Sequence, residues 1–65
     1  MLLTIPQVVS RFADLGVEYW HIDRLCRSGL IQYQQPGHDR LIEERDLPRV
    51  RAVLAEEGRI LKERR

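Results

Sequence analysis

The sequence predicts a mainly α-helical domain with one small β-hairpin. Apolar residues recur at helical spacing in three segments, and Gly16 and Gly29 close the first two of these segments. Two short apolar-polar runs flank Pro36-Gly37, which is a turn signal. A chain of 65 residues allows one small domain, covering residues 1–65. Such a domain buries a small core and is only marginally stable by itself.

The first helix is expected over residues 5–15. Thr4 stands three positions before Gln7 with Pro6 between them, which is a capping-box pattern with proline in the first turn. Gly16 ends the helix, because glycine adopts the left-handed conformation at no steric cost. The apolar residues at helical spacing are Val8, Val9, Phe12 and Leu15.

The second helix is expected over residues 18–28. Its apolar face carries Ile22, Leu25 and Cys26, with Val17 in the preceding turn. The opposite face carries Trp20, Asp23, Arg24 and Arg27. Two helices joined by a short turn that contains glycine form a helix-turn-helix pattern.

The rest of the chain predicts the hairpin and a longer helix. The two strands are expected at residues 31–34 and 40–42, and they must lean on the helices because an isolated hairpin is unstable. The last helix should begin near Asp46 or Leu47, with Pro48 tolerated in its first turn. The expected core residues are Val8, Phe12, Val17, Ile22, Leu25, Leu30, Leu41, Leu47, Val50 and Leu54.

Composition gives no support for an enzyme. Catalysis usually needs a pocket in which titratable groups converge, and a domain of this size is too small for a deep one. The single cysteine, Cys26, is expected to face the core and not to act as a nucleophile. His21 and His38 lack the spacing of zinc ligands, and no glycine-rich phosphate loop is present. We expect no catalytic residue, metal site or cofactor.

The sequence also bounds the compartment. No segment approaches the ~20 apolar residues that span a membrane, and the opening MLLTIPQVV lacks the basic region of a signal peptide. A lone cysteine suits a reducing environment. We therefore expect a cytoplasmic protein with no membrane partner.

The polar face of the second helix is suited to DNA. A helix that follows a tight turn can enter the major groove, where arginines bind phosphates and base edges. Arg24 and Arg27 supply such donors; the alternative is a solvated face with an internal pair to Asp23. Trp20 is expected to be exposed because a partner covers it; the alternative is packing on the chain's own hairpin or last helix. The flanking polar residues are His21 and Ser28.

The hairpin turn provides a second set of candidate DNA contacts. Gln35 and His38 lie beside its Pro-Gly tip, and Arg40 is placed to reach a phosphate. Glutamine can bind adenine through two hydrogen bonds. The alternative for Gln35 and His38 is a polar, solvated turn.

In order and spacing, the motifs resemble a known family. The stretch LLTIPQVVSRFADLGVEYWHIDRLCRSGLI, followed by YQQPGHDRLIEERDL, is similar to the winged helix-turn-helix of MerR-type regulators and of the small phage and plasmid excisionases. The shared features are the opening, the GV before the second helix, the RSGLI after it, and the RLIEERDL that ends the wing. Together they cover nearly the whole chain.

The resemblance implies sequence-specific binding of double-stranded DNA, with the second helix in the major groove and the wing on the backbone. It assigns Trp20, His21, Arg24 and Arg27 to the recognition surface and Arg40 to the base of the wing. The chain departs from the family at two positions. Glu18 stands where the family usually has Ser or Thr, and Asp23 stands where it often has arginine.

Length and charge favour an excisionase-like protein, encoded by a prokaryote or phage, over a ligand-sensing activator. The chain stops at Arg65, whereas MerR-type activators add a long dimerisation helix and an effector domain. A stand-alone DNA-binding domain and a fragment of a longer protein stay open as alternatives. Basic and acidic residues number 11 and 10, so binding by one chain should be weak. The resemblance therefore implies cooperative assembly on adjacent sites, through self-association or contact with a recombinase (integrase), and no small-molecule effector. A MerR-like role in transcription regulation stays open beside the role in DNA recombination.

A competing hypothesis is a protein-interaction module that has the same fold and little affinity for DNA. Tyr19 and Trp20 would then anchor a protein–protein interface, since aromatic residues and arginines are the usual anchors there. The basic end of the chain, RILKERR, is either an amphipathic tail for a second protomer or recombinase, or a frayed helix end.

Overall fold

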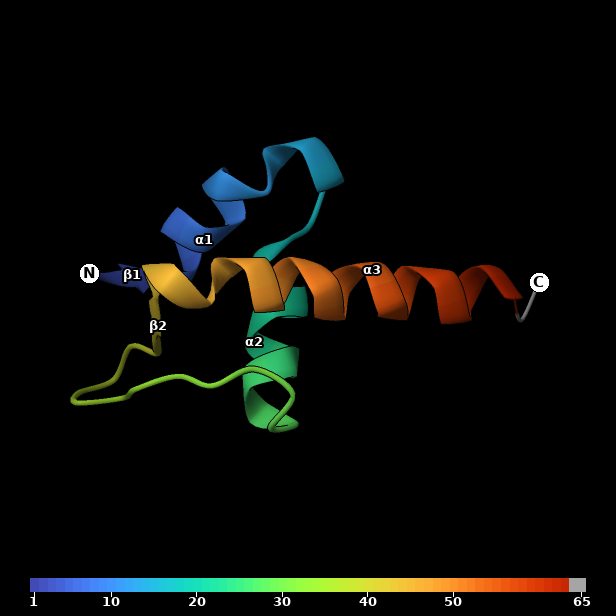
Figure 1. The fold of residues 1–65 in the computed structure, drawn as a ribbon. Helices are drawn as coiled ribbons and strands as arrows, with labels where there is room; N and C mark the ends of the chain where they lie inside the picture. Colours follow the sequence, from blue (N-terminus) through green and yellow to red (C-terminus); the bar gives the residue numbers. More distant parts are fainter. Residues whose placement is uncertain (64–65) are drawn as a thin grey trace.

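The fold is mainly helical, with a two-stranded antiparallel sheet. A computed structural model describes the backbone of residues 1–63 and the side chains of residues 1–57. In chain order the elements are β1 Leu2–Thr4, α1 Ile5–Arg11, a 3-10 turn Ala13–Leu15, α2 Tyr19–Arg27, β2 Leu41–Glu43, a second 3-10 turn Glu44–Asp46, and α3 Leu47–Glu63 (Figure 1).

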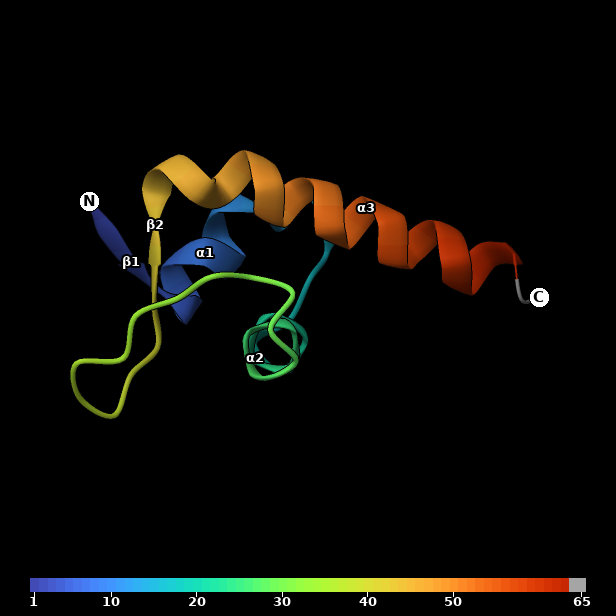
Figure 2. The same cartoon turned by 60° about the horizontal axis from the view of Figure 1, so that its bottom comes forward.

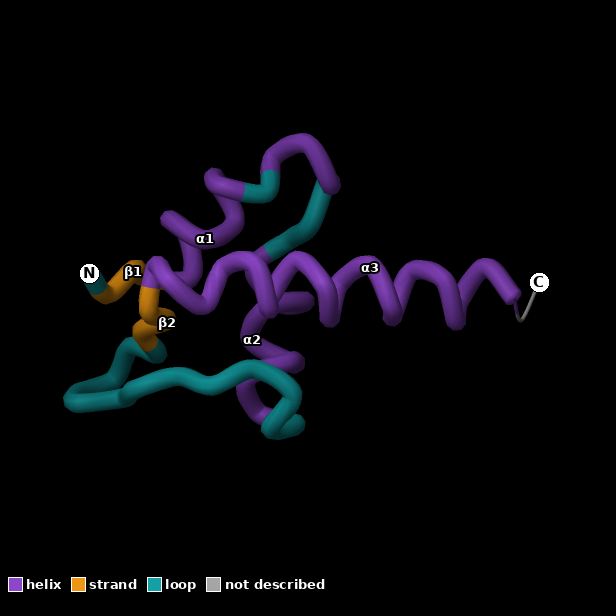
Figure 3. Tube along the Cα trace, in the orientation of Figure 1, coloured by secondary structure: helices purple, strands orange, loops and turns teal. Residues whose placement is uncertain are grey.

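The helix α3 crosses both shorter helices and extends beyond them (Figures 1 and 2). Figure 2 views α2 nearly end-on, beneath α3. A long loop between α2 and β2 runs past α2 and returns to the sheet (Figure 3). Within the described part of the chain, no helix has both the length and the apolar character needed to cross a membrane.

The sheet pairs different strands from those that the sequence predicts. β2 is antiparallel to β1, with Leu3 opposite Ile42, and not to the expected strand at residues 31–34. That segment contributes one isolated bridge, in which Gln34 and Leu41 exchange backbone hydrogen bonds of 2.8 and 2.7 Å. The predicted pairing of residues 31–34 with 40–42 is therefore present only as this one antiparallel pair, and β1 is the strand that pairs with the whole of β2. Alternating polarity marks a strand but does not identify its partner.

The first helix begins as predicted and ends early. The Thr4 side chain caps the backbone N–H of Gln7, and the Gln7 side chain accepts from the Thr4 N–H at 2.9 Å. Regular helix stops at Arg11, although residues 5–15 were expected to be one helix. The N–H of Phe12 is shared between two carbonyl oxygens, and the chain tightens into a 3-10 turn. Spacing of three residues is common to both helix types, so the apolar pattern does not separate them.

The two glycines end their segments as expected. Gly16 has a φ of +67° and Gly29 a φ of +82°, in the left-handed region. After α2, the N–H of Gly29 donates to the carbonyl of Cys26 and the N–H of Leu30 to that of Leu25, both at 3.1 Å. This pair of hydrogen bonds is a Schellman motif, which satisfies the last carbonyls of the helix.

The core lies between the sheet and the three helices. The expected residues Val8, Phe12, Ile22, Leu25, Val50 and Leu54 are buried, and Cys26 is buried with them. Val17 and Leu47 are partly buried against this core, and Leu41 is partly exposed. The core also includes residues that the sequence analysis did not select, namely Leu3, Ile5, Ile31 and Ile42.

At two places the expected core is displaced by one residue. Leu30 was expected to be buried and is 48% exposed, whereas the next residue, Ile31, is buried. Likewise Ile42 is fully buried in place of Leu41. The Schellman turn reverses the chain at Gly29 and presents Ile31 to the core. The register of β2 on β1 presents Ile42, because alternate residues of a strand face opposite sides.

This strand phase predicts a difference between two adjacent substitutions. Ile42→Ala removes fully buried atoms and should cost ~2–5 kcal/mol of unfolding free energy. Leu41→Ala, at a partly exposed position, should cost clearly less. Urea unfolding followed by circular dichroism measures both. An equal or larger loss for Leu41→Ala would contradict the register of the sheet.

Candidate functional site

The orientation of α2 agrees with its sequence pattern. Ile22 and Leu25 are buried, while Trp20 is 58% exposed. Arg24 and Arg27 lie on the same outer face as Trp20. The outward position of Trp20 is therefore confirmed, while its cover by a partner stays a prediction.

The indole of Trp20 is partly engaged within α2. Its Nε1–H donates to the carboxylate of Glu18, which precedes α2 and makes no side-chain hydrogen bond to the helix backbone. Its ring stacks on His21 with 5.3 Å between centroids and 22° between planes. The guanidinium of Arg24 lies 5.9 Å from the Trp20 ring centroid, close enough for a cation–π contact. The indole N–H is therefore occupied, and the open part of Trp20 is its apolar ring.

One carboxylate of α3 joins this group to the last helix. Arg24 Nη2 donates to both oxygens of Glu57, at 2.8 and 3.2 Å. His21 Nε2 lies 3.1 Å from Oε2 of the same carboxylate, so a proton on Nε2 would complete a hydrogen bond. One connected group of side chains thus includes Glu18, Trp20, His21, Arg24 and Glu57.

A second carboxylate joins α2 to the loop. Asp23 accepts from Arg40 Nη1 at 2.6 Å and forms an ion pair with Arg27 at 3.2 Å. The Arg40 guanidinium also lies 5.5 Å from the ring centroid of Tyr33. Interaction with the Tyr33 side chain is the largest cause that raises the pKa of Arg40; desolvation opposes it, and the Asp23 charge adds to it. The ion pair with Asp23 ties the loop to α2.

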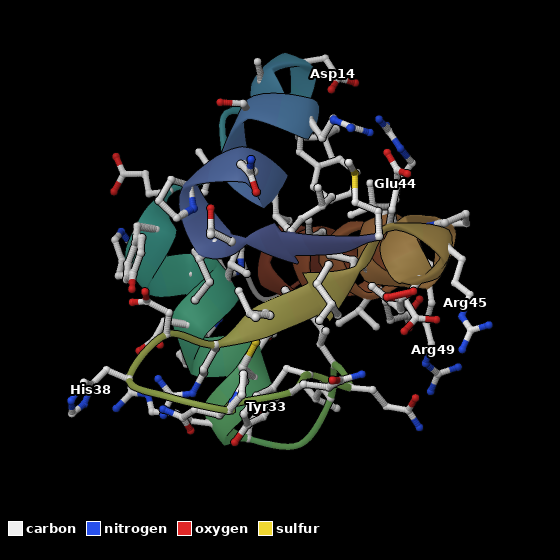
Figure 4. The ribbon with its side chains drawn as sticks, turned by 90° about the vertical axis from the view of Figure 1, so that its left-hand side faces the viewer. Asp14, Tyr33, His38, Glu44, Arg45 and Arg49 are labelled. Atoms are coloured by element: carbon white, nitrogen blue, oxygen red, sulfur yellow. The ribbon has the colours of Figure 1, made fainter. Side chains whose placement is uncertain are left out.

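The remaining predicted contacts have mostly local hydrogen bonds. Ser28 Oγ donates to the carbonyl of Leu25 at 3.0 Å, and Gln35 Nε2 donates to the carbonyl of His38 at 3.0 Å. Figure 4 shows His38 at the tip of the loop, pointing away from the body of the domain. The structure thus brings Trp20, His21 and Arg24 together. It leaves Gln35 and His38 on the projecting loop.

Cys26 lies on the buried face of α2. This burial raises the pKa of its thiol, so the protonated form dominates near neutral pH. The expectation that Cys26 faces the core is confirmed. Among residues with described side chains, no three His, Cys, Asp or Glu come together in a geometry that could hold a metal ion.

Sequence reasoning missed Glu57 and two arginines. Glu57 meets Arg24 across 33 positions of the chain, and no local pattern signals such a contact. Arg45, in the second 3-10 turn, and Arg49, in the first turn of α3, have no ion pair within the described residues, unlike Arg11 and Arg51. Figure 4 shows both pointing outward from the edge of the domain that is remote from α2.

Comparison of the chain with models of protein families, with curated proteins and with solved structures gives no match. The resemblance to MerR-type regulators and excisionases is therefore carried by the sequence motifs alone.

The two arginines that share Asp23 should differ in their effect on stability. The side chain of Arg40 is 24% exposed and that of Arg27 is 61% exposed. Arg40→Ala should lower the melting temperature and change the amide shifts of the loop, because it frees the loop and leaves Asp23 with only Arg27. Arg27→Ala should change stability little, as is usual for an exposed pair. Thermal unfolding and amide NMR spectra test this, and an equal loss for both variants would contradict the role given to Arg40.

Proposed function

We propose that this protein binds double-stranded DNA as a winged helix-turn-helix, with α2 in the major groove and the loop between α2 and β2 as the wing. The observation that carries the proposal is the outer face of α2. It exposes Trp20, Arg24 and Arg27 together, and the Arg40–Asp23 pair fixes the loop at its side. A helix of this width fits the major groove.

The contacts within this face suggest a role for each residue. Arg27 has a more exposed side chain than Arg24, so it is the first candidate for a contact with a base edge or phosphate. Trp20 would lie against a sugar or a thymine methyl through its ring, because its N–H is taken by Glu18. The end of α2 and the loop tip would meet the backbone through Ser28, Gln35 and His38. Arg40 would act mainly by positioning the loop.

Charge balance supports weak binding by a single chain. The α2 face carries Arg24 and Arg27, and the loop beside it carries Arg40. The carboxylates of Glu18, Asp23 and Glu57 contact residues of this surface. Phosphate contacts provide most of the affinity for DNA. A face with balanced charge therefore favours cooperative assembly on adjacent sites, with further copies or a recombinase, as in an excisionase-like protein. A MerR-like transcription regulator would use the same face.

A protein-interaction module is the second candidate, and the ion pairs favour it. Each arginine of the α2 face already has a carboxylate partner, while Tyr19 and Trp20 are both more than half exposed. Exposed aromatic residues beside arginines are typical anchors of protein interfaces. Salt separates the two candidates, because phosphate binding weakens steeply as salt rises and an apolar interface does not.

Arg27→Ala tests the DNA-binding proposal. A base-edge contact should cost ~1–3 kcal/mol and relax the preference at one base position, whereas a phosphate contact should weaken all sequences alike. The matched control is Arg51→Ala, since Arg51 also forms an exposed 3.2 Å ion pair, with Asp14. Figure 4 places Asp14 at the opposite end of the domain from Tyr33 and the loop. Fluorescence anisotropy with labelled duplexes at two salt concentrations gives the affinities.

Equal effects of Arg27→Ala and Arg51→Ala would contradict the recognition-helix assignment. Binding of the unmodified protein that does not depend on salt would contradict phosphate contacts altogether. Retention of a protein partner at high salt would then favour the interaction module.

The assembly proposal predicts a separate effect for the end of the chain. Truncation after Gly58 should leave the fold intact, because the buried residues within the described part extend only to Leu54. It should abolish cooperative binding to adjacent sites, if the apolar residues Ile60 and Leu61 meet a neighbour. These two side chains lie outside the described residues. Unchanged cooperativity, partner binding and stability of the truncated chain would show that the segment is a solvated helix end.

A further inference from the structure

The Glu57–Arg24 pair joins the proposed DNA face to the last helix, α3. We propose that Glu57 is a positioning residue that holds Arg24 in place. Arg24 would then contact DNA only where the DNA offers an acceptor that competes with the Glu57 carboxylate. This inference rests on the DNA-binding function proposed above. Glu57 itself would make no contact with DNA and would act through Arg24.

The geometry of the pair favours a maintained contact over a chance one. One nitrogen of Arg24 reaches both oxygens of Glu57, at 2.8 and 3.2 Å. The oxygen of the shorter contact also lies 3.1 Å from His21 Nε2, so the carboxylate is held from two directions. The His21 ring is in turn stacked on Trp20. The Glu57 carboxylate is thus already oriented to accept hydrogen bonds from Arg24.

Arg24 and Arg27 differ in what their release would leave behind. When Arg27 leaves Asp23, that carboxylate keeps Arg40 at 2.6 Å. When Arg24 leaves Glu57, the carboxylate keeps only His21 within the described contacts. It would also stand near the approaching phosphates with its negative charge. Recruiting Arg24 therefore costs more than recruiting Arg27, although both lie on the same face of α2.

This cost would act as a filter on DNA sequence. Exchanging a carboxylate for a single phosphate replaces one anionic acceptor by another, so the net gain is small. A guanine offers two acceptors to arginine in the major groove and can compensate for the lost pair. Glu57 would thus suppress the contribution of Arg24 to non-specific binding and preserve it at suitable base pairs. The released Arg24 would therefore donate hydrogen bonds to the major-groove edge of a guanine.

A double-mutant cycle of Glu57→Gln and Arg24→Ala tests the inference. Binding is measured by anisotropy on a duplex pool of random sequence, as a function of salt. Glu57→Gln should raise affinity for the pool roughly three- to tenfold, the contribution of one charge-assisted contact. It should also steepen the slope of log K against log salt by about 0.9, for one added phosphate contact. Arg24→Ala should cost more affinity in the Glu57→Gln background than in the unmodified chain, and it should remove this gain.

The chain offers a matched control pair. Arg11 and Glu44 are 2.7 Å apart, and the Arg11 side chain is 47% exposed compared with 49% for Arg24. Figure 4 shows Glu44 on the side of the domain away from α2. Glu44→Gln removes the same charge as Glu57→Gln, so any gain that both share reflects net charge alone. Glu57→Asp is a second variant, because it keeps the charge but withdraws the carboxylate from Arg24, and it should also raise affinity.

The outcomes separate failure of the inference from failure of the function. If Glu57→Gln equals Glu44→Gln, or if Arg24→Ala costs the same in both backgrounds, the positioning role is overturned while DNA binding stands. If Glu57→Gln only lowers the melting temperature, and neither it nor Glu57→Asp increases affinity, Glu57 is a structural link between α2 and α3. If neither the protein nor any variant binds DNA at low salt, the proposed function fails and the inference fails with it.

Discussion

The pairing of β1 with β2 is the constraint on which the rest of this domain depends. It buries Leu3 and Ile42 opposite each other, and the backbone N–H of Glu44 donates to the carbonyl of Met1 at 2.8 Å. α1 begins immediately after β1, and α3 follows β2 after one 3-10 turn. The sheet therefore fixes the starting points of two helices at once. The buried face of α2 then packs into the same core as α1 and α3.

Carboxylates determine how much positive charge α2 presents to a partner. Asp23 belongs to α2 itself and connects the helix to the loop through Arg40, so it contributes to the shape of the surface. Glu57 comes from α3 and engages Arg24, so it links the surface to the packing of another helix. A mere count of arginines would overstate the attraction for DNA, because ion pairs formed within the domain compete with phosphates. The same pairs explain how a domain with almost no net charge can still have a defined polar face.

The exposed Trp20 is the feature that connects structure to function most directly. A large aromatic ring left 58% exposed loses favourable burial, and this domain has a small core with little stability in reserve. The ring is stiffened by His21 on one side and by the Glu18 carboxylate at its N–H. A surface that is already ordered loses less conformational entropy when it binds. This holds for a DNA partner and for a protein partner alike.

The sequence by itself determined the features that depend on neighbouring residues. The capping box at Thr4, the end of the first segment at Gly16 and the apolar phase of α2 all follow from contacts within a few positions, where residue type dictates the geometry. The outward position of Trp20 followed from that phase. The site residues of α2 could be placed on one face for the same reason.

Only the tertiary structure decided which distant segments meet. A strand pattern at residues 40–42 is compatible with several partners, and burial of Ile42 selected β1 over the neighbouring loop. As a result Ile42 is buried where Leu41 was expected to be. The Schellman turn likewise buries Ile31 where Leu30 was expected to be. The Glu57 side chain reaches that of Arg24 because α3 packs on the same core as α2, and no local sequence pattern predicts this contact. Long-range pairing is set by the packing of the whole domain, and local sequence does not encode it.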